Sequence, residues 1–147
     1  MKLFKTIDKV LSAFGNIRAM ERTHVDTFTE DLISKVKGDK IAESNFAQLY
    51  VTYQNLSDYN FLNISVLSAT DIKSFKGCNL VFESHNNQIT IPSDTKEIES
   101  DFSNVSNRYL TKISFIINKS EKEMISKGNF EKVFINFKKK SLPMVKV

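Results

Sequence analysis

Histidine and cysteine are the side chains most often recruited for acid–base and nucleophilic chemistry near neutral pH. The chain has two histidines, His24 and His85, and one cysteine, Cys78. Cys78 and His85 stand seven residues apart in what reads as one extended region, and a strand of that length would hold them about 20 Å apart. We therefore expect no catalytic pair here, and we expect Cys78 to be a small buried apolar residue.

Two groups of acidic residues suggest metal binding at first sight. His24 could join Asp26 and Glu30 in a metal site, but a metal pair on a helix needs both ligands on one face, and His24 and Asp31 are poorly phased for that. A polar loop carries the second group, which consists of Asp94, Glu97, Glu99 and Asp101. This loop lacks the spacing and the turn glycine of a calcium-binding loop. We expect solvated side chains at both places, with no metal and no cofactor.

The remaining motifs of common enzymes are missing. The chain has no Gly-x-Ser-x-Gly sequence, and its four glycines are too few and too scattered to form a phosphate-cradling loop. The carboxylates of residues 94–101 could supply a pair for glycoside hydrolysis, but carbohydrate sites usually contain tryptophan, and this chain has none. The sequence therefore favours a non-enzymatic protein, with an enzymatic or small-molecule pocket between helices and sheet as one alternative.

Basic side chains are concentrated at the C-terminal end. Residues 108–147 carry a net charge of +7, whereas residues 47–107 carry −4 and residues 1–46 carry +1. Lysines alternating with an aromatic residue on one strand face are typical of nucleic-acid or anionic-surface binding. The candidate interaction surface consists of Lys112, Lys132, Phe134, Lys138 and Lys140. The competing interpretation places Phe134 under a helix with lysine stems packed around it. Arginine, which usually leads phosphate recognition, is nearly absent from this region.

Two N-terminal helices are expected to cover the sheet. Residues 3–14 repeat apolar side chains at helical spacing. A second helix is expected from near Thr23 to Gly38, with either Thr23 or Thr27 as its N-terminal cap. The lysines opposite the apolar face of the first helix also fit an interfacial membrane helix. We favour packing of that face on the sheet or on the second helix. No stretch is apolar enough to span a bilayer.

Apolar and polar residues alternate with a period of two from residue 47 onward, which predicts half-buried strands. The expected strands cover residues 47–54, 62–66, 80–82, 89–91, 109–117 and 133–137. Residues 93–107 read as a long loop, and Ser120 with Glu123 forms a capping box that predicts a short helix ending at Gly128. The short connections favour antiparallel neighbours. Lys138–Lys140 and Pro143 are expected to end the regular structure.

Together these patterns predict an α+β protein, with two N-terminal helices on a mainly antiparallel sheet of about five to six strands and a short helix before the last strand. We expect a single domain over residues 1–147, with a helical segment 1–46, a sheet region 47–140 and a tail 141–147. The lone cysteine and the absence of a signal-peptide pattern favour a soluble cytoplasmic protein. A protein-interaction module, self-associating or with an unknown protein partner, is the first functional hypothesis.

Overall fold

The computed structural model describes residues 27–147 of the chain. These residues divide into two compact units. One unit contains residues 27–35 together with Ser103–Asn107, and the other contains Val36–Phe102 together with Arg108–Val147. The second unit holds nearly all of the regular structure and all of the residues that matter for the site described below.

The smaller unit is organised around one carboxylate. Residues 27–34 are helical, and the Oε1 atom of Glu30 accepts hydrogen bonds of 2.7 Å from the hydroxyl groups of Ser103 and Ser106. Hydrogen bonds to a charged acceptor are stronger than those between neutral groups. Glu30 therefore ties the turn that contains Ser103 and Ser106 to the helix.

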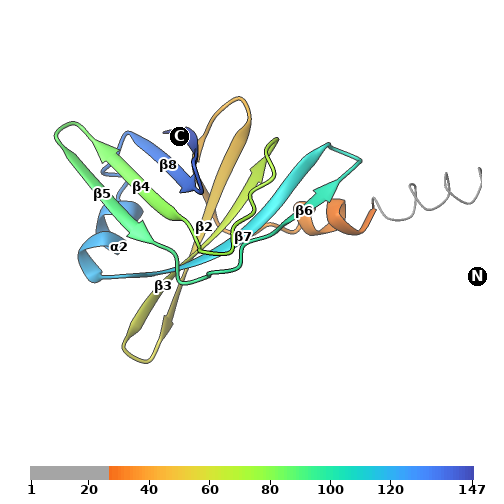
Figure 1. Ribbon diagram of the computed structural model, residues 1–147. Helices are drawn as coiled ribbons and strands as arrows, with labels where there is room; N and C mark the ends of the chain where they lie inside the picture. Colours follow the sequence, from red (N-terminus) through yellow and green to blue (C-terminus); the bar gives the residue numbers. More distant parts are fainter. Residues whose placement is uncertain (1–26) are drawn as a thin grey trace, which may run out of the picture. The chain divides into compact units, whose positions relative to one another are not determined.

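A single antiparallel sheet of nine strands dominates the structure, in the order β5-β4-β8-β9-β1-β2-β3-β7-β6 (Figure 1). The strands are β1 (Asp39–Glu43), β2 (Ala47–Leu56), β3 (Tyr59–Ser68), β4 (Asn79–Ser84), β5 (Asn87–Pro92), β6 (Ser100–Ser103), β7 (Arg108–Ile117), β8 (Lys132–Phe137) and β9 (Lys140–Lys146). A short helix, α2 (Lys119–Ser126), connects β7 to β8. The prediction of antiparallel neighbours is confirmed for this sheet.

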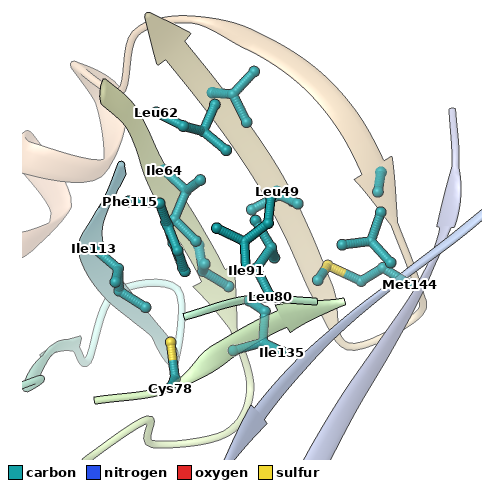
Figure 2. Packing of buried hydrophobic residues seen from close by; sticks show 14 of the residues in the cluster. Leu49, Leu62, Ile64, Cys78, Leu80, Ile91, Ile113, Phe115, Ile135 and Met144 are labelled. Carbon is teal, nitrogen blue, oxygen red and sulfur yellow. The ribbon is translucent and has the colours of Figure 1, made fainter. Parts of the chain in front are cut away.

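The hydrophobic core lies on the inner face of the sheet and follows directly from the alternating pattern. Figure 2 shows Leu49 of β2, Leu62 and Ile64 of β3, Leu80 of β4 and Ile135 of β8 pointing toward one another. All five side chains are almost completely buried. Burying a side chain of this size contributes about 1.5–3 kcal/mol relative to leaving it exposed, so the shared inner face fixes the register of each strand.

The sheet curls into a half-barrel, and its two sides meet at one corner. Ser93, directly after β5, forms an isolated β-bridge with Phe115 of β7. The N–H group of Asp94 donates a 2.8 Å hydrogen bond to the carbonyl oxygen of Ser114 nearby. The segment that follows β5 is therefore held by main-chain hydrogen bonds against β7, which lies near the other end of the strand order.

The α+β prediction is wrong, because the described residues are mostly β and their sheet has nine strands rather than five to six. Residues 39–43 form β1 instead of part of a helical segment, and β6 lies inside the expected loop 93–107. Both strands are short, with five and four residues, so they show too little alternation to be recognised. The second expected helix is described from residue 27 and stops at residue 34, before Gly38. The helix expected over residues 3–14 lies outside the described residues.

Residues Lys140–Lys146 form strand β9, whereas the sequence predicts that regular structure ends at Lys138–Lys140 and Pro143. Proline lacks an N–H donor, which is why Pro143 predicts a strand end. In the structure Pro143 lies opposite Phe134 of β8, while β1 pairs with β9 only farther on, through Val145 and Lys146. Pro143 therefore has a neighbouring strand on one side only, and β9 tolerates it as an edge strand would.

Helix α2 forms where it was predicted, but its cap is two residues earlier. The side chain of Asn118 accepts a 2.7 Å hydrogen bond from the N–H of Glu121, and the Glu121 carboxylate accepts one of 2.9 Å from the N–H of Asn118. These two bonds make the capping box, so the box predicted at Ser120 is wrong. Of the helices in the described part of the chain, none is long and apolar enough to cross a membrane.

Candidate functional site

A pocket of about 650 Å³ lies on the outer side of the sheet, at one end of β4, β5 and β8. Asn79, Pro92 and Asn136 line it from three neighbouring strands, since Asn79 pairs with Pro92 on one side and with Asn136 on the other. These residues alternate with buried core residues such as Leu80 and Ile135. The alternation therefore turns Asn79 and Asn136 away from the core and into the pocket. Volumes of this size are typical of small-molecule sites.

Four lysines line the pocket. Lys76 comes from the loop before β4, Lys96 from the segment after β5, and Lys138 and Lys139 from the turn between β8 and β9. Among residues 27–147, which the structure describes, no carboxylate lines the pocket with them. Asp94 and Glu97 flank Lys96 closely in the sequence but are absent from the lining.

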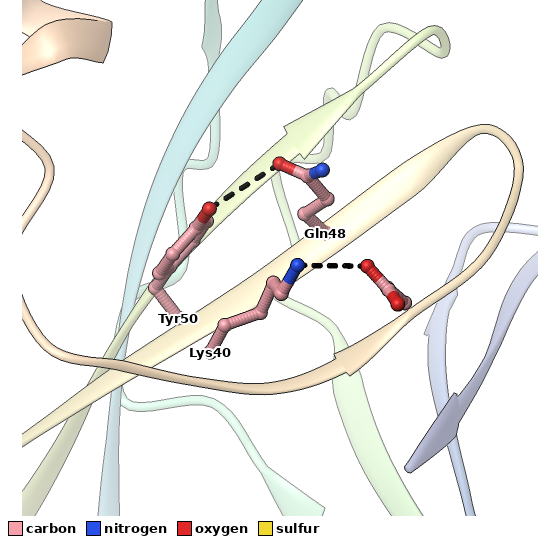
Figure 3. A network of polar contacts seen from close by, with 4 residues as sticks. Lys40, Gln48 and Tyr50 are labelled. Carbon is pink, nitrogen blue, oxygen red and sulfur yellow. Dashed lines mark hydrogen bonds and ion pairs between the residues drawn. The ribbon is translucent and has the colours of Figure 1, made fainter. Parts of the chain in front are cut away.

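The charges of these lysines are not neutralised by described residues. Lys40, by contrast, forms an ion pair with Glu43, in which its Nζ atom lies 2.9 Å from Oε1 (Figure 3). None of the four pocket lysines forms an ion pair with any residue of the range 27–147. Lys96 makes one long contact, 3.5 Å from its Nζ atom to the carbonyl oxygen of Ser93. The pocket therefore gathers positive charge that a multivalent anion could neutralise.

The loop that carries Lys76 is fixed by hydrogen bonds. Ser74 and Ile98 exchange two main-chain bonds of 3.0 and 2.7 Å, and the N–H of Gly77 donates to the carbonyl oxygen of Lys96 at 2.8 Å. Gly77 has a φ of +81°, and a Cβ atom there would lie 2.6 Å from Oγ of Ser93. Only glycine fits this position without strain. The loop and the segment around Lys96 are therefore held together before any ligand arrives.

Two unusual features occur at this pocket. The Oδ1 atom of Asn136 is buried and has no hydrogen-bond partner among the described residues. Lys138 has a φ of +53°, in the left-handed region that side chains other than glycine, asparagine and aspartate rarely adopt. Ser57 and Asn107 also have positive φ angles and lie outside the pocket lining, so the conformation of Lys138 by itself does not mark a functional site.

Phe75 lines the same pocket and is 64% exposed. The Nζ atom of Lys73 lies 5.7 Å from the centroid of its ring, within the range of a cation–π contact. Phe75 sits in the loop that Ser74 and Gly77 fix, because the Ser74 hydroxyl donates to the Gly77 carbonyl oxygen at 2.7 Å. The aromatic ring is thus presented at the pocket by a well-anchored turn.

Cys78 is buried, with 7% of its surface exposed, as predicted. Burial raises the pKa of its thiol from 9.0 to about 11, and a hydrogen bond with Ser93 opposes this only in part. The thiol is therefore neutral at physiological pH and a poor nucleophile. His85 lies in the turn at the far end of β4 from Cys78, so the two residues are separated by the whole strand. His24 lies outside the described residues.

The four carboxylates of residues 94–101 do not converge on one point. Within residues 27–147, no three side chains of His, Cys, Asp or Glu approach closely enough to hold a metal ion. Asp94, Glu97, Glu99 and Asp101 are all exposed, but Asp101 lies on strand β6 and not in the loop expected from the sequence.

The structure separates the residues of the predicted interaction surface. Lys138 lines the pocket, whereas Lys112, Lys132, Phe134 and Lys140 do not. Lys112 lies on β7, and four strands (β9, β1, β2 and β3) separate it in the sheet from Lys132 and Phe134 on β8. Phe134 is only half-buried, opposite Pro143 and Val81 on its two neighbouring strands. The role of this set as an interaction surface stays a prediction.

The sequence pointed to only one of the four pocket lysines. Lys76 and Lys96 fall in residues 47–107, whose net charge of −4 makes that region look acidic. Lys139 stands in the run Lys138–Lys140, which predicts the end of a strand and gives no sign of a pocket. One local signal was present, namely the run Ser74-Phe75-Lys76-Gly77, which combines an aromatic residue and a lysine directly before a turn glycine.

No family model, no curated protein and no solved structure matches this chain. A fold by itself does not imply a function, which depends on the residues of a site. The pocket that gathers four lysines, one aromatic ring and two asparagines is therefore the feature from which a function can be inferred.

Proposed function

We propose that this protein binds a phosphate-bearing ligand in the pocket formed by Lys76, Lys96, Lys138 and Lys139. The observation that carries the proposal is the convergence of four lysines, without a carboxylate, on one concave site of about 650 Å³. Ammonium groups recognise phosphate as point charges and need no fixed fork geometry. Binding of this kind requires no catalytic group, which agrees with the preference for a non-enzymatic role.

The energetic features of the pocket support the proposal. Four like charges that face one concave surface repel each other, and the fold adds an unpartnered amide oxygen at Asn136 and a left-handed lysine at position 138. A bound polyanion would offset the repulsion, and it would explain why the turn between β8 and β9 keeps lysine where glycine or asparagine is usual.

The pocket and the basic C-terminal region are two different candidate sites for anion binding. Lys138 is common to both, but two of the four pocket lysines come from the acidic middle of the sequence. Lys112 and Lys132 are not part of the pocket lining, although Lys132 shares the outer face of β8 with Asn136. The two interpretations therefore make different predictions for the same assay.

Isothermal titration with inorganic tripolyphosphate tests the proposal. Replacement of Lys138 and Lys139 together by glutamine should lower the affinity at least about tenfold, because each charge-assisted hydrogen bond contributes about 1.5–3 kcal/mol. Lys112→Gln with Lys132→Gln removes the same total charge outside the pocket and serves as the control. Raising the salt concentration should weaken binding by the unchanged protein.

Three results would contradict the proposal. One is a complete absence of tripolyphosphate binding at low salt. Another is an equal loss of affinity in the Lys138/Lys139 variant and the Lys112/Lys132 control, which would show that overall charge matters rather than the pocket. The third is unchanged affinity in the Lys138/Lys139 variant.

Self-association is a second candidate, and one feature favours it. Leu56 and Tyr59 are exposed at the tip of the β2–β3 hairpin, the lowest loop of Figure 1. Phe61 of β3 pairs with the exposed Ile116 of β7 farther along the same face. Exposed apolar side chains grouped in this way are typical of protein contacts, and a second copy of the chain is the simplest partner because symmetric dimers are the commonest oligomers.

Sedimentation velocity over a wide range of protein concentration tests self-association. We expect the unchanged protein to sediment faster as its concentration rises, and Tyr59→Glu with Ile116→Glu to remain monomeric. A monomer at every concentration would rule this candidate out. The hairpin lies outside the pocket lining, so the result leaves phosphate binding to be decided by its own assay.

A further inference from the structure

We infer that the ligand of this pocket is a nucleotide, whose base stacks on Phe75 while its phosphate groups contact the pocket lysines. The inference rests on the proposed phosphate binding and adds the identity of the group attached to the phosphate. Phe75 belongs to the same pocket lining as the four lysines, so one ligand can touch the ring and the charges together.

The surroundings of Phe75 suit stacking. Its ring stays 64% exposed even though Lys73 lies over it, 5.7 Å from the ring centroid. The remaining lining consists of the four lysines, Ser74, Ser93, Asn79, Asn136, Gly77, Pro92 and the buried Cys78. A large exposed ring within a basic concave surface is the combination by which proteins bind the bases and phosphates of nucleotides.

The loop holds the ring in place before binding. Hydrogen bonds from Ser74 to Ile98 and to Gly77 fix the residues on both sides of Phe75, and Gly77 is bonded in turn to the segment of Lys96. Little conformational entropy would be lost on stacking, because the turn is already ordered. The distance between the aromatic and the basic parts of the site is set by the same hydrogen bonds.

The lining also indicates how specific the recognition is. It contains no arginine, and the bidentate reading of guanine usually depends on arginine. Lysine charges and a stacked ring recognise features that all nucleotides share. We therefore expect the protein to distinguish a nucleotide from a simple polyphosphate, with little preference among the bases.

The experiment compares thymidine triphosphate with inorganic tripolyphosphate, both titrated into the full-length chain. Stacking should make the nucleotide bind roughly 5- to 150-fold more tightly than tripolyphosphate. Phe75→Leu should remove most of this advantage and leave the affinity for tripolyphosphate within about twofold, whereas Phe75→Trp should keep the advantage. Phe46→Leu is the control, because Phe46 is 67% exposed and lies outside the pocket lining.

The outcomes separate this inference from the proposed function. If tripolyphosphate binds and the nucleotide binds no more tightly, the inference falls and phosphate binding stands. If neither compound binds, phosphate binding falls as well. A nucleotide advantage that survives Phe75→Leu, or that Phe46→Leu removes equally, would also overturn the assignment to Phe75.

A third titration, with an oligothymidylate, decides whether the pocket binds a nucleotide within a single strand or a free nucleotide. Tighter binding of the oligonucleotide than of thymidine triphosphate, with a steeper loss of affinity as salt rises, would assign the pocket to a single strand. Equal or weaker binding would assign it to a free nucleotide. Both results support stacking on Phe75 provided that Phe75→Leu weakens them.

Discussion

The left-handed conformation of Lys138 leads to a prediction in which stability and binding change in opposite directions. Lys138 and Ser57 each occupy the first position of a two-residue turn, between β8 and β9 and between β2 and β3. Their φ angles are 53° and 59°. Ser57 lies outside the pocket lining and Lys138 is part of it. Replacing each of them by asparagine is therefore a pair of substitutions matched in backbone conformation, which differ in the pocket and in the charge that Lys138→Asn removes.

The expected magnitude follows from the backbone. A side chain in the left-handed region costs roughly 1–2 kcal/mol, and asparagine is among the few residues that adopt it routinely. We expect Lys138→Asn and Ser57→Asn each to raise the free energy of unfolding by about 0.5–1 kcal/mol, since part of the penalty remains with asparagine. For a chain of this size 1 kcal/mol changes the midpoint of thermal unfolding by about 2–4 °C.

Two assays on the same samples test the pair. Thermal unfolding followed by circular dichroism should show similar stabilisation in both variants. Titration with tripolyphosphate should show weaker binding for Lys138→Asn and unchanged binding for Ser57→Asn. The reasoning would be refuted if Lys138→Asn destabilised the fold, or if both variants lost the same affinity.

Three further predictions concern the core, the helix cap and the pocket loop. Burial raises the pKa of Cys78 from 9.0 to about 11. The part of the unfolding free energy that depends on the neutral thiol is therefore complete below pH 9.0 and is lost as pH rises toward 11. Urea unfolding across this range should show a smaller fall in unfolding free energy for Cys78→Ala than for the unchanged protein. Asn118→Ala should lower the unfolding free energy by about 1 kcal/mol, whereas urea unfolding of Ser120→Ala should stay within about 0.5 kcal/mol of the unchanged protein. Gly77→Ala should lower the melting temperature and weaken tripolyphosphate binding, since its Cβ would lie 2.6 Å from Oγ of Ser93; unchanged binding would show that the loop does not shape the pocket.

The sequence predicted the long strands well because each of them has one buried face. Strands β2, β3 and β7 have ten residues each, enough for several periods of alternation. Strands β1, β6 and β9 were not predicted. Two of them are too short to alternate clearly, and β9 contains Pro143, which normally argues against a strand. The sheet was therefore underestimated because two short strands and one strand with a proline were missed.

The pocket could not be predicted in the same way, because its members are brought together by the order of the strands. Lys76, Lys96 and the pair Lys138–Lys139 lie in three separate parts of the sequence. They meet because β4 pairs with β5 on one side and with β8 on the other. No local periodicity encodes that order, which depends on pairings between residues far apart in the chain. The net charge of residues 47–107 hides the pocket, because it adds Lys76 and Lys96 to carboxylates that lie outside the pocket lining.

The pocket and the closure of the sheet share one residue, Ser93. Its N–H donates to the carbonyl oxygen of Cys78 at 2.9 Å, and its hydroxyl accepts from the N–H of Cys78 at 3.0 Å and donates to the carbonyl oxygen of Thr95 at 2.6 Å. The same residue bridges Phe115 of β7 and lines the pocket. A ligand held by Lys96 therefore contacts the segment that joins β5 to β7. Ligand binding and the contact between the segment after β5 and β7 are linked reciprocally. A ligand that stabilises this contact therefore binds more tightly when the contact is formed. A substitution that weakens the contact should also weaken ligand binding, even if it changes none of the four lysines.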